Sequence, residues 1–401
     1  MSDDLKIFGK NHLGIDGFRV QSIDGTWLTY RKGGKDLRPV ADENDVILID
    51  MDGEILYSYT KAEFAQLTKL PTIPTLKYSF LTQDGWNWTL SDAKEYVAKY
   101  GELVIGAQYT TTDDKNHCLF DFPRGVTFTI GIYIANAGAS SGNTITVDWG
   151  DGTTPTTETD IGRNITKTYT HTYSAKGTYD ITWTCSNLNS RIVGSTTCLG
   201  FCKAIAIKST SNYYEFYYNG DFIFLAGSTN TAGNMFKYIA SPAVIFPRGF
   251  VVSYGNSNWF QNMAVTALKY VSWDKEAQYI SGSNRNGVLT DYCYTSCRCL
   301  RRITALDNTM AMGANTLNNC ISLIRFNVPS SVTDIAANAL NGCTKLEELH
   351  FFPTSPPVVA NANAFTNIPT TCKIYVPTGY LTAYKTASNY PDPETYTYVE
   401  E

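Results

Sequence analysis

A short pattern returns at a fixed interval near the C-terminal end of the chain. It has the form Cys-x-x-Leu-x-x-apolar, and its members are Cys297 with Leu300, Cys320 with Leu323, and Cys343 with Leu346. Each cysteine follows the previous one by 23 residues, and the leucines keep the same step. A period in the twenties indicates units that each have one apolar face and bury it by stacking on their neighbours. The pattern therefore predicts a leucine-rich solenoid.

The repeat resembles one family, the BspA-like leucine-rich repeats. The resemblance rests on the phrase from Val328 to Leu346, which contains Asn338-Ala339-Leu340-Asn-Gly-Cys343. The array also ends in the manner of that family, because Lys373 to Tyr384 provides a last strand, a proline stop and a short capping helix. The resemblance covers residues 290–390 and implies a solenoid that serves in adhesion.

We place the whole solenoid at residues 208–390, with residues 208–290 as degenerate repeats and residues 391–401 as a tail. The degenerate part contains an aromatic hairpin around Asn219-Gly220. Tyrosine offers a large contact area at a small entropy cost, which makes an exposed row of tyrosines a good ligand surface. The candidate binding residues are Tyr213, Tyr214, Tyr217 and Tyr218. The alternative is that these tyrosines are buried in the first coils of the solenoid.

The composition narrows the class of protein. Charged residues are 17% of the 401 residues, below the usual quarter or so, while tyrosine and phenylalanine are abundant. This texture is typical of β-rich extracellular or virion proteins. The net charge of −5 gives no basic surface, so we expect no nucleic-acid partner. The N-terminal segment has no apolar core of a signal peptide, and no apolar stretch is long enough to span a membrane, so we expect no membrane insertion.

The ten cysteines admit three interpretations. At the matched repeat positions a small buried side chain fills the stack, and we favour this packing role over disulfides. The spacings Cys198-x-x-x-Cys202 and Cys293-x-x-x-Cys297-x-Cys299 are loosely similar to metal sites, but zinc sites need tighter pairs or Cys/His clusters. The four histidines stand alone in the sequence. We therefore predict no metal and no cofactor.

Residues 1–16 are predicted to be an arm, and residues 17–115 a small α+β attachment module. Two Asp-Gly pairs, Asp24-Gly25 and Asp52-Gly53, mark hairpins between alternating strands. A capping box at Thr60 and Glu63 opens a first helix. A second helix is expected over residues 92–99, because Gly101 follows it as a C-cap, and a strand over residues 103–109.

The order of these elements resembles a module of tail, baseplate and other structural proteins of bacteriophages from gut bacteria. The resemblance covers residues 45–112 and includes the Trp86-Asn87-Trp88 turn and the Ile105-Gly-x-x-Tyr109 phrase. It implies attachment to other virion proteins through the N-terminal region. Trp86 and Trp88 have two interpretations, a platform that stacks on sugars or a pair of packing anchors, and we favour the anchors.

Residues 116–207 have a purely β texture. They contain Trp149-Gly150-Asp151-Gly152, then His171-x-Tyr173 and Gly177-x-Tyr179. These motifs resemble the PKD-type immunoglobulin-like β-sandwich. Asp151 and Gly152 would turn a hairpin, and Tyr179 would bury its ring while tethering its hydroxyl, as tyrosine corners do. Nearby aspartates leave a calcium site open as an alternative to solvated turn carboxylates, which we favour.

The predicted fold class is mainly β and multi-domain, with the α+β module, the PKD-type sandwich and the leucine-rich repeat solenoid in that order. Because no catalytic motif is found, we predict a protein that is not an enzyme. We favour a bacteriophage virion protein, a fibre, baseplate or capsid appendage, that binds a host cell-surface glycan or protein. It is expected to be a homo-oligomer of three copies. The missing signal peptide favours this virion over the alternative, a BspA-like adhesin on a bacterial surface, and a third possibility is a glycan-degrading virion enzyme.

Overall fold

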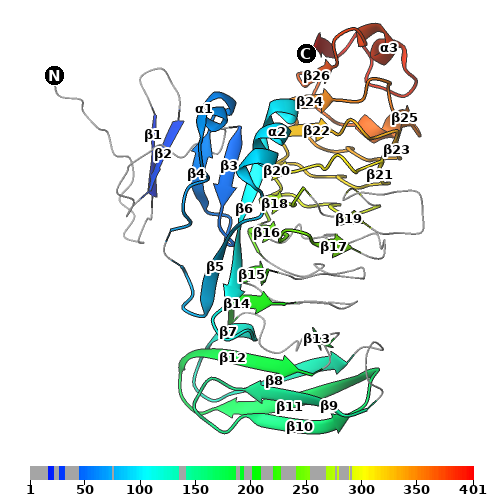
Figure 1. The fold of residues 1–401 in the computed structure, drawn as a ribbon. Coiled ribbons are helices and arrows are strands. Elements are labelled where there is room, and N and C mark those ends of the chain that lie inside the picture. The colour runs from blue at the N-terminus through cyan, green and yellow to red at the C-terminus, as the bar shows by residue number, and fades with distance from the viewer. Residues whose placement is uncertain are drawn as a thin grey trace, which may run out of the picture.

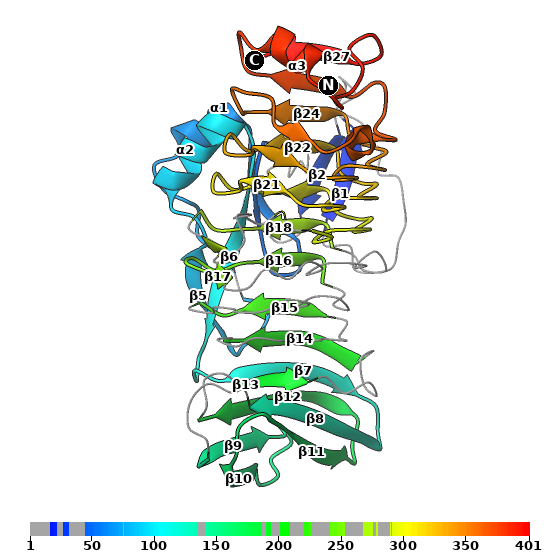
Figure 2. The same cartoon turned by 90° about the vertical axis from the view of Figure 1, so that its right-hand side faces the viewer.

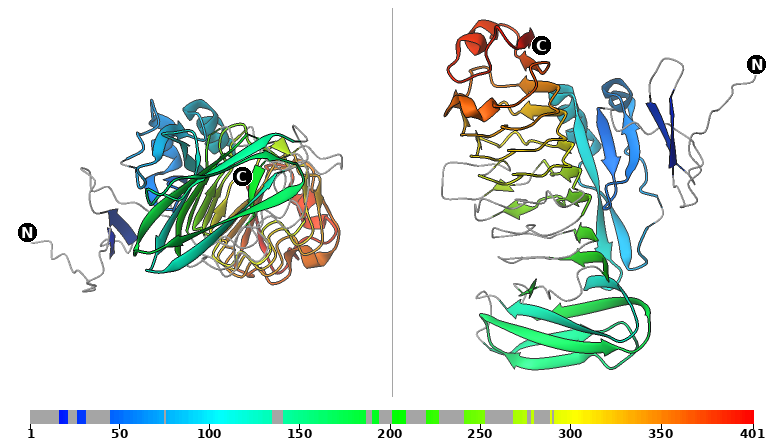
Figure 3. Two further views of the ribbon diagram at one scale, coloured as in Figure 1. Left: turned by 90° about the horizontal axis from the view of Figure 1, so that it is seen from below. Right: turned by 180° about the vertical axis from the view of Figure 1, so that it is seen from behind.

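The computed structural model describes residues 17–21, 27–31, 45–74, 76–134, 141–186, 190–193, 201–208, 220–226, 241–252, 268–275, 278–279, 289 and 291–401. The molecule is elongated and mainly β. A stack of short strands forms its long axis, two sheets of longer strands close one end, and the small helix α3 (Leu381–Thr386) lies at the other (Figures 1 and 2). A smaller α+β module lies beside the stack (Figure 3).

The N-terminal module has a four-stranded sheet with the order β4-β3-β6-β5. Its elements are β3 (Val46–Ile49), β4 (Ile55–Tyr59), α1 (Lys61–Gln66), β5 (Leu81–Trp86), α2 (Leu90–Tyr100) and β6 (Leu103–Thr111). Strands β3 and β6 are parallel. Helix α1 follows β4 and helix α2 precedes β6, and both lie at the upper end of the module in Figure 1. Ahead of the module, β1 (Gly17–Gln21) pairs antiparallel with β2 (Trp27–Arg31). The hairpin predicted around Asp24-Gly25 is therefore present, although the turn lies outside the described residues.

Local signals set the ends of both helices. Thr60 caps α1 in a capping box, with Glu63 N donating to Thr60 Oγ1 (3.2 Å) and Thr60 N donating to Glu63 Oε2 (2.9 Å). The helix α2 begins at Leu90, before the predicted residue 92, because the Oγ1 of Thr89 accepts from Asp92 N (3.1 Å). The helix ends at Gly101, which takes the left-handed conformation (φ 80°) as predicted.

Two sheets pack face to face at the end of the molecule. One has the order β10-β9-β12-β7-β14-β15 and the other β11-β8-β13. Phe120 and Phe122 of β7 lie 4.8 and 5.4 Å, ring to ring, from Phe128 of β8. The strands are β7 (Asn116–Phe122), β8 (Val126–Ile134), β9 (Asn143–Asp148), β10 (Thr156–Ile161), β11 (Ile165–Tyr173), β12 (Gly177–Cys185), β13 (Ser190–Val193) and β14 (Cys202–Ile207). That this unit is of the PKD type stays a prediction.

The sandwich and the solenoid share a sheet. Strand β14 pairs antiparallel with β7 and parallel with β15 (Asp221–Phe224). One sheet therefore continues across residue 207, where the sequence suggests a domain boundary. The antiparallel sandwich thus becomes a parallel stack at β14.

Parallel strands in two successive sheets line one side of the solenoid, and shorter strands line another. Pairing Arg325 with Glu348 and Phe326 with Leu349 places equivalent repeat positions side by side. Residues 391–401, predicted as a tail, include β27, which pairs with β26 and extends this sheet. The first of the two sheets consists of β16 (Ala243–Ile245), β18 (Tyr270–Ser272) and β20 (Arg302–Ile303), and the second of β22 (Arg325–Val328), β24 (Glu348–Phe351), β26 (Lys373–Val376) and β27 (Thr397–Glu400). The shorter elements are β17 (Val251–Val252), β19 (Gln278–Tyr279), β21 (Ala311–Met312), β23 (Asp334–Ile335), β25 (Val358–Val359) and the 3₁₀ helix η3 (Ala362–Phe365).

The module covers part of the solenoid sheet. Ile47, Ile49 and Val104 of the module form one apolar cluster with Ala243, Ile245 and Tyr270 of the solenoid. The approach is close at Gly106, because a Cβ there would lie only 2.7 Å from Cγ1 of Ile245 and closer still to its Cγ2. Glycine is needed at this position so that the two sheets can approach one another.

The Trp86-Asn87-Trp88 segment joins the module to the solenoid. The side-chain Nδ2 of Asn87 donates to Phe246 O (3.0 Å) and Ser272 Oγ (2.9 Å), while its Oδ1 accepts from Gly106 N (2.8 Å). Trp88 Nε1 donates to Trp273 O (2.7 Å). Both tryptophans are buried, as packing anchors and not as an exposed sugar platform.

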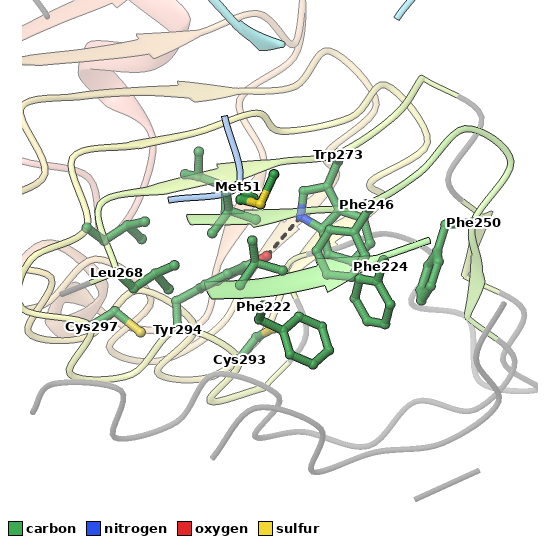
Figure 4. Packing of buried hydrophobic residues seen from close by; sticks show 14 of the residues in the cluster. Met51, Phe222, Phe224, Phe246, Phe250, Leu268, Trp273, Cys293, Tyr294 and Cys297 are labelled. Carbon is green, nitrogen blue, oxygen red and sulfur yellow. Dashed lines mark hydrogen bonds between the residues drawn. The ribbon is translucent and has the colours of Figure 1, made fainter. Parts of the chain in front are cut away.

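These contacts reach the solenoid core. Trp273 stacks on Phe246 with ring centroids 3.6 Å apart and donates through Nε1 to Tyr294 Oη (3.0 Å; Figure 4). The same buried cluster contains apolar residues of the module, the sandwich and the solenoid. Module and solenoid therefore share one core, and removing the module would expose it to water.

Gly106→Ala tests this close approach. Overpacking costs about 1–3 kcal/mol, so we expect a free energy of unfolding lower by that amount in urea denaturation. The double variant Gly106→Ala with Ile245→Ala should recover part of the loss, because it removes the two clashing carbons. Equal stability of Gly106→Ala and the wild type would contradict the role given to Gly106.

His117 lies where the module meets the sandwich. Its ring stacks on Phe80 of the module (4.5 Å), Nδ1 faces Asp180 (2.9 Å) and Nε2 faces Asp113 (2.9 Å). Burial alone would lower the pKa of His117, but the hydrogen bonds to Asp180 and Asp113 outweigh it and raise the pKa above its ordinary value. The protonated ring therefore stabilises this junction.

The raised pKa predicts how stability depends on pH. The contribution of His117 is fully present below its unfolded pKa, about 6.5, and is lost as the pH rises through the folded pKa. Between these two values the free energy of unfolding should fall by up to about 1.4 kcal/mol per pH unit. His117→Gln should remove this slope in urea titrations above pH 6.5 or so, and Asp180→Asn should shift it to lower pH. An unchanged slope in His117→Gln would refute the assignment.

Candidate functional site: the open face of the solenoid sheet

Successive residues of a strand point to opposite faces of the sheet, so each solenoid strand has inward and outward positions. In β22, Phe326 and Val328 are buried in the core, and Arg325 and Asn327 occupy the outward positions. Under the module the outward residues include the apolar Ile245 and Tyr270 and the buried, hydrogen-bonded Ser272. Beyond the module they are polar. The chemistry of the face thus changes at the edge of the covered part.

The part of the sheet beyond the module is called the open face here. It consists of the outward residues of β22, β24 and β26: Arg325, Asn327, Glu348, His350, Lys373 and Tyr375. Strand pairing places these side chains in two parallel rows along the axis of the solenoid. Helix α2 lies beside β20 and β22 at the edge of this face (Figure 1).

A chain of charged groups runs across the open face. Arg325 faces Glu102 of the module (Nε to Oε1, 3.7 Å) and Glu348 (Nη1 to Oε2, 3.6 Å). His350 lies between Glu348 (3.3 Å) and Glu401 (2.7 Å). Its ring stacks flat on Tyr375, 4.2 Å between centroids. Lys373 is exposed and has no ion-pair partner within the described residues.

Burial changes the pKa of Glu102, the carboxylate that the module contributes to this chain of charges. It raises the pKa of Glu102, while Arg302 and Arg325 act in the opposite direction. Most charges of the face neutralise one another in pairs. Such a surface offers hydrogen-bond donors and acceptors at regular steps.

The tyrosines predicted to bind, Tyr213, Tyr214, Tyr217 and Tyr218, lie outside the described residues. Sequence reasoning missed the open face because it aligned only the cysteines and leucines of the repeats. The signal was present: at the 23-residue step Arg325 aligns with Glu348, and Asn327 with His350. Polar residues at the outward positions of successive repeats mark this face, on which Asn327 and His350 are buried while Arg325, Glu348, Lys373 and Tyr375 reach solvent.

The sandwich motif residues form a turn and a tether. Gly150 and Gly152 take positive φ (71° and 80°), and Trp149 is buried. Burial would raise the pKa of Asp151, but its hydrogen bonds to Thr153 and His171 lower it to about 2. Tyr179 Oη donates to Ala175 O (2.9 Å). The described residues contain no group of three His, Cys, Asp or Glu placed to hold a metal ion.

The repeat cysteines and leucines all lie in the solenoid core. Cys297, Cys320, Cys343, Leu300, Leu323 and Leu346 are fully buried, and the three cysteines are thiols that form no disulfide. Two thiols also donate across repeats, Cys320 Sγ to Tyr294 O (3.2 Å) and Cys343 Sγ to Leu317 O (3.3 Å). Burial raises the pKa of both thiols, to about 12 for Cys343. All three cysteines therefore fill the stack, and Cys320 and Cys343 each also donate to a carbonyl of the preceding repeat.

Two substitutions of Cys320 distinguish the effect of lost side-chain volume on stability from the effect of a buried charge. Cys320→Ala removes one buried sulfur and its hydrogen bond, and should lower the free energy of unfolding by about 1 kcal/mol in urea denaturation. Cys320→Asp places a charge in the same apolar site and should unfold the array. Cys299→Ala, at an exposed cysteine in the preceding repeat, is the matched control and should leave stability unchanged. Tolerance of Cys320→Asp would overturn the packing role.

Comparison with protein families matches residues 269–387 to the BspA type leucine rich repeat region, in six copies. Residues 269–387 are a BspA-type leucine-rich repeat region. This confirms the predicted resemblance and extends the repeats upstream of residue 290. No curated protein matches the chain.

Two solved structures share similarity with the chain. One is a leucine-rich repeat protein from Bacteroides ovatus ATCC 8483, with 16% identity and a TM-score of 0.32 over 50% of this chain and 54% of that one. The other is the pneumococcal vaccine antigen PcpA, with 12% identity and a TM-score of 0.32 over 52% of this chain and 61% of that one. In both cases the match covers less than two thirds of the solved chain.

Among the described residues, no helix is both long and apolar enough to cross a membrane.

Proposed function

We propose that this chain is a non-enzymatic adhesion protein whose open face binds an extended glycan or protein on a cell surface. The observation that carries the proposal is the arrangement of the outward side chains of β22, β24 and β26 in two rows. Neighbouring strands are about 4.8 Å apart, so the rows offer equivalent contacts at regular steps to a ligand that lies along the axis. The BspA-type repeats support adhesion as the role.

The charge pattern favours binding over catalysis. Arg325 and His350 are each held between two carboxylates. A group held in this way keeps its position when a ligand arrives, which lowers the ordering cost of binding. Individual contacts on a shallow face are weak, and three copies of the chain would raise the avidity without a new contact.

We place the protein in a bacteriophage virion, attached to other virion proteins through its N-terminal region, with the solenoid presented to the host. The sequence resemblance of residues 45–112 to structural proteins of gut phages supports this location. The alternative is an adhesin on a bacterial surface, which the BspA-type repeats favour. Mass spectrometry of purified virions and of bacterial surface fractions separates these locations, since the protein should be found in only one of them.

The double variant Lys373→Ala with Tyr375→Ala tests the open face. The probe is an array of bacterial capsular and cell-wall polysaccharides, followed by calorimetric titration with the polysaccharide that binds best. Each lost contact is worth about 1 kcal/mol, so the affinity should fall roughly tenfold or more. Lys373 is exposed and Tyr375 is half-buried against His350, so the melting temperature is recorded as well and the affinity is compared between fully folded proteins.

A matched control uses the same residue types on the terminal cap. Tyr380→Ala with Lys385→Ala changes an exposed tyrosine and an exposed lysine at α3, away from the open face. This control should bind like the wild type. The proposed function is wrong if the double variant of Lys373 and Tyr375 binds as tightly as the double variant of Tyr380 and Lys385. It is also wrong if no polysaccharide and no host-cell protein binds the wild type.

A further inference from the structure

A small cavity lies at the border between the module and the open face. Glu102 lines it from the module, and Arg302, Thr304 and Asn327 line it from the solenoid. Its volume is about 10 Å³, which is close to the minimum that a single water-sized group needs. Asn327 also belongs to the open face, so the cavity lies at one end of the two rows of outward residues.

One side chain that lines this cavity lacks a partner. The Oγ1 of Thr304 is buried and makes no hydrogen bond, and the residue as a whole is only 4% exposed. Buried polar atoms in native proteins almost always have a hydrogen-bond partner, because leaving one unpaired is costly. An unpaired hydroxyl that lines a cavity of this size indicates that a polar group from outside the chain completes the site.

The charges around the cavity select the kind of group. Of the residues that line it, Glu102 and Arg302 are charged, so one negative and one positive group border the site. A neutral group therefore fits better than an ammonium or a carboxylate. A hydroxyl can donate to the carboxylate of Glu102 and accept from Thr304 at the same time. Asn327 Nδ2 already donates to Glu102 Oε1 (3.3 Å) and holds that carboxylate in place.

We infer that this cavity receives one hydroxyl of a carbohydrate bound along the open face. The inference rests on the proposed function and narrows its ligand to a polyhydroxylated chain. The cavity fixes where such a chain starts, because a hydroxyl placed there sets the position of the sugar along the rows. Thr304 is then a specificity residue for the end of the ligand, while Lys373 and Tyr375 contact it further along the axis.

Thr304→Val tests the inference, because valine has the shape of threonine without the hydroxyl. The full chain is titrated with the array polysaccharide that binds best, and its melting temperature is recorded. Loss of one hydrogen bond should weaken binding about fivefold. The melting temperature should stay equal or rise, because an unpaired buried hydroxyl is removed. Thr304→Ser keeps the hydroxyl and should bind like the wild type.

The other outcomes separate two failures. If Thr304→Val binds like the wild type while Lys373→Ala with Tyr375→Ala weakens binding, the open face is a glycan site and the cavity is not part of it. If Thr304→Val lowers the melting temperature and leaves the affinity unchanged, the cavity holds a structural water and the inference is wrong. If no variant changes binding, the proposed function itself fails.

Discussion

The close approach of strand β6 to strand β16 determines how the rest of the molecule is arranged. Gly106 has no side chain, so the module sheet can lie directly on Ile245 of the solenoid. Asn87 then uses its whole amide at this contact, with its two polar atoms bonded to Gly106 on one side and to Phe246 and Ser272 on the other. A buried amide with all partners present fixes one register between the two sheets, because any shift would leave polar atoms unpaired.

This contact decides which part of the solenoid remains available to a ligand. The module covers outward residues of β16 and β18, including the apolar Ile245 and Tyr270, and its Asp45 O accepts from Arg302 of β20. It ends where Arg325 and Asn327 begin the polar rows, and both of these side chains donate to Tyr100 O at the end of α2. The same two residues therefore complete the helix terminus and begin the open face. The module thus packs on the strands around Ile245 and Tyr270 and holds Arg325 and Asn327 in position by hydrogen bonds at the edge of the open face.

Local patterns could be predicted from the sequence because their signals are local. The 23-residue step identified the buried cysteines and leucines, and the caps at Thr60 and Gly101 set helix ends. The tryptophans of the Trp86-Asn87-Trp88 segment were assigned to packing, but their partners were not foreseen. Asn87 and Ser272 are 185 residues apart, and a contact made once between distant segments leaves no periodic trace. The open face was missed for another reason, since its residues repeat in position and differ in type.

The charged groups link the cover to the binding surface. Three carboxylates lie in a row: Glu102 of the module, Glu348 of the sheet and Glu401 after the last strand. Arg325 lies between the first two and His350 between the last two. A ligand that touches Arg325 or Glu348 therefore contacts groups that the docked module already holds in place. By reciprocity, a ligand that prefers this arrangement also strengthens the docking of the module. Under the proposed function, recognition at the open face and the union of module and solenoid would both depend on the same set of contacts.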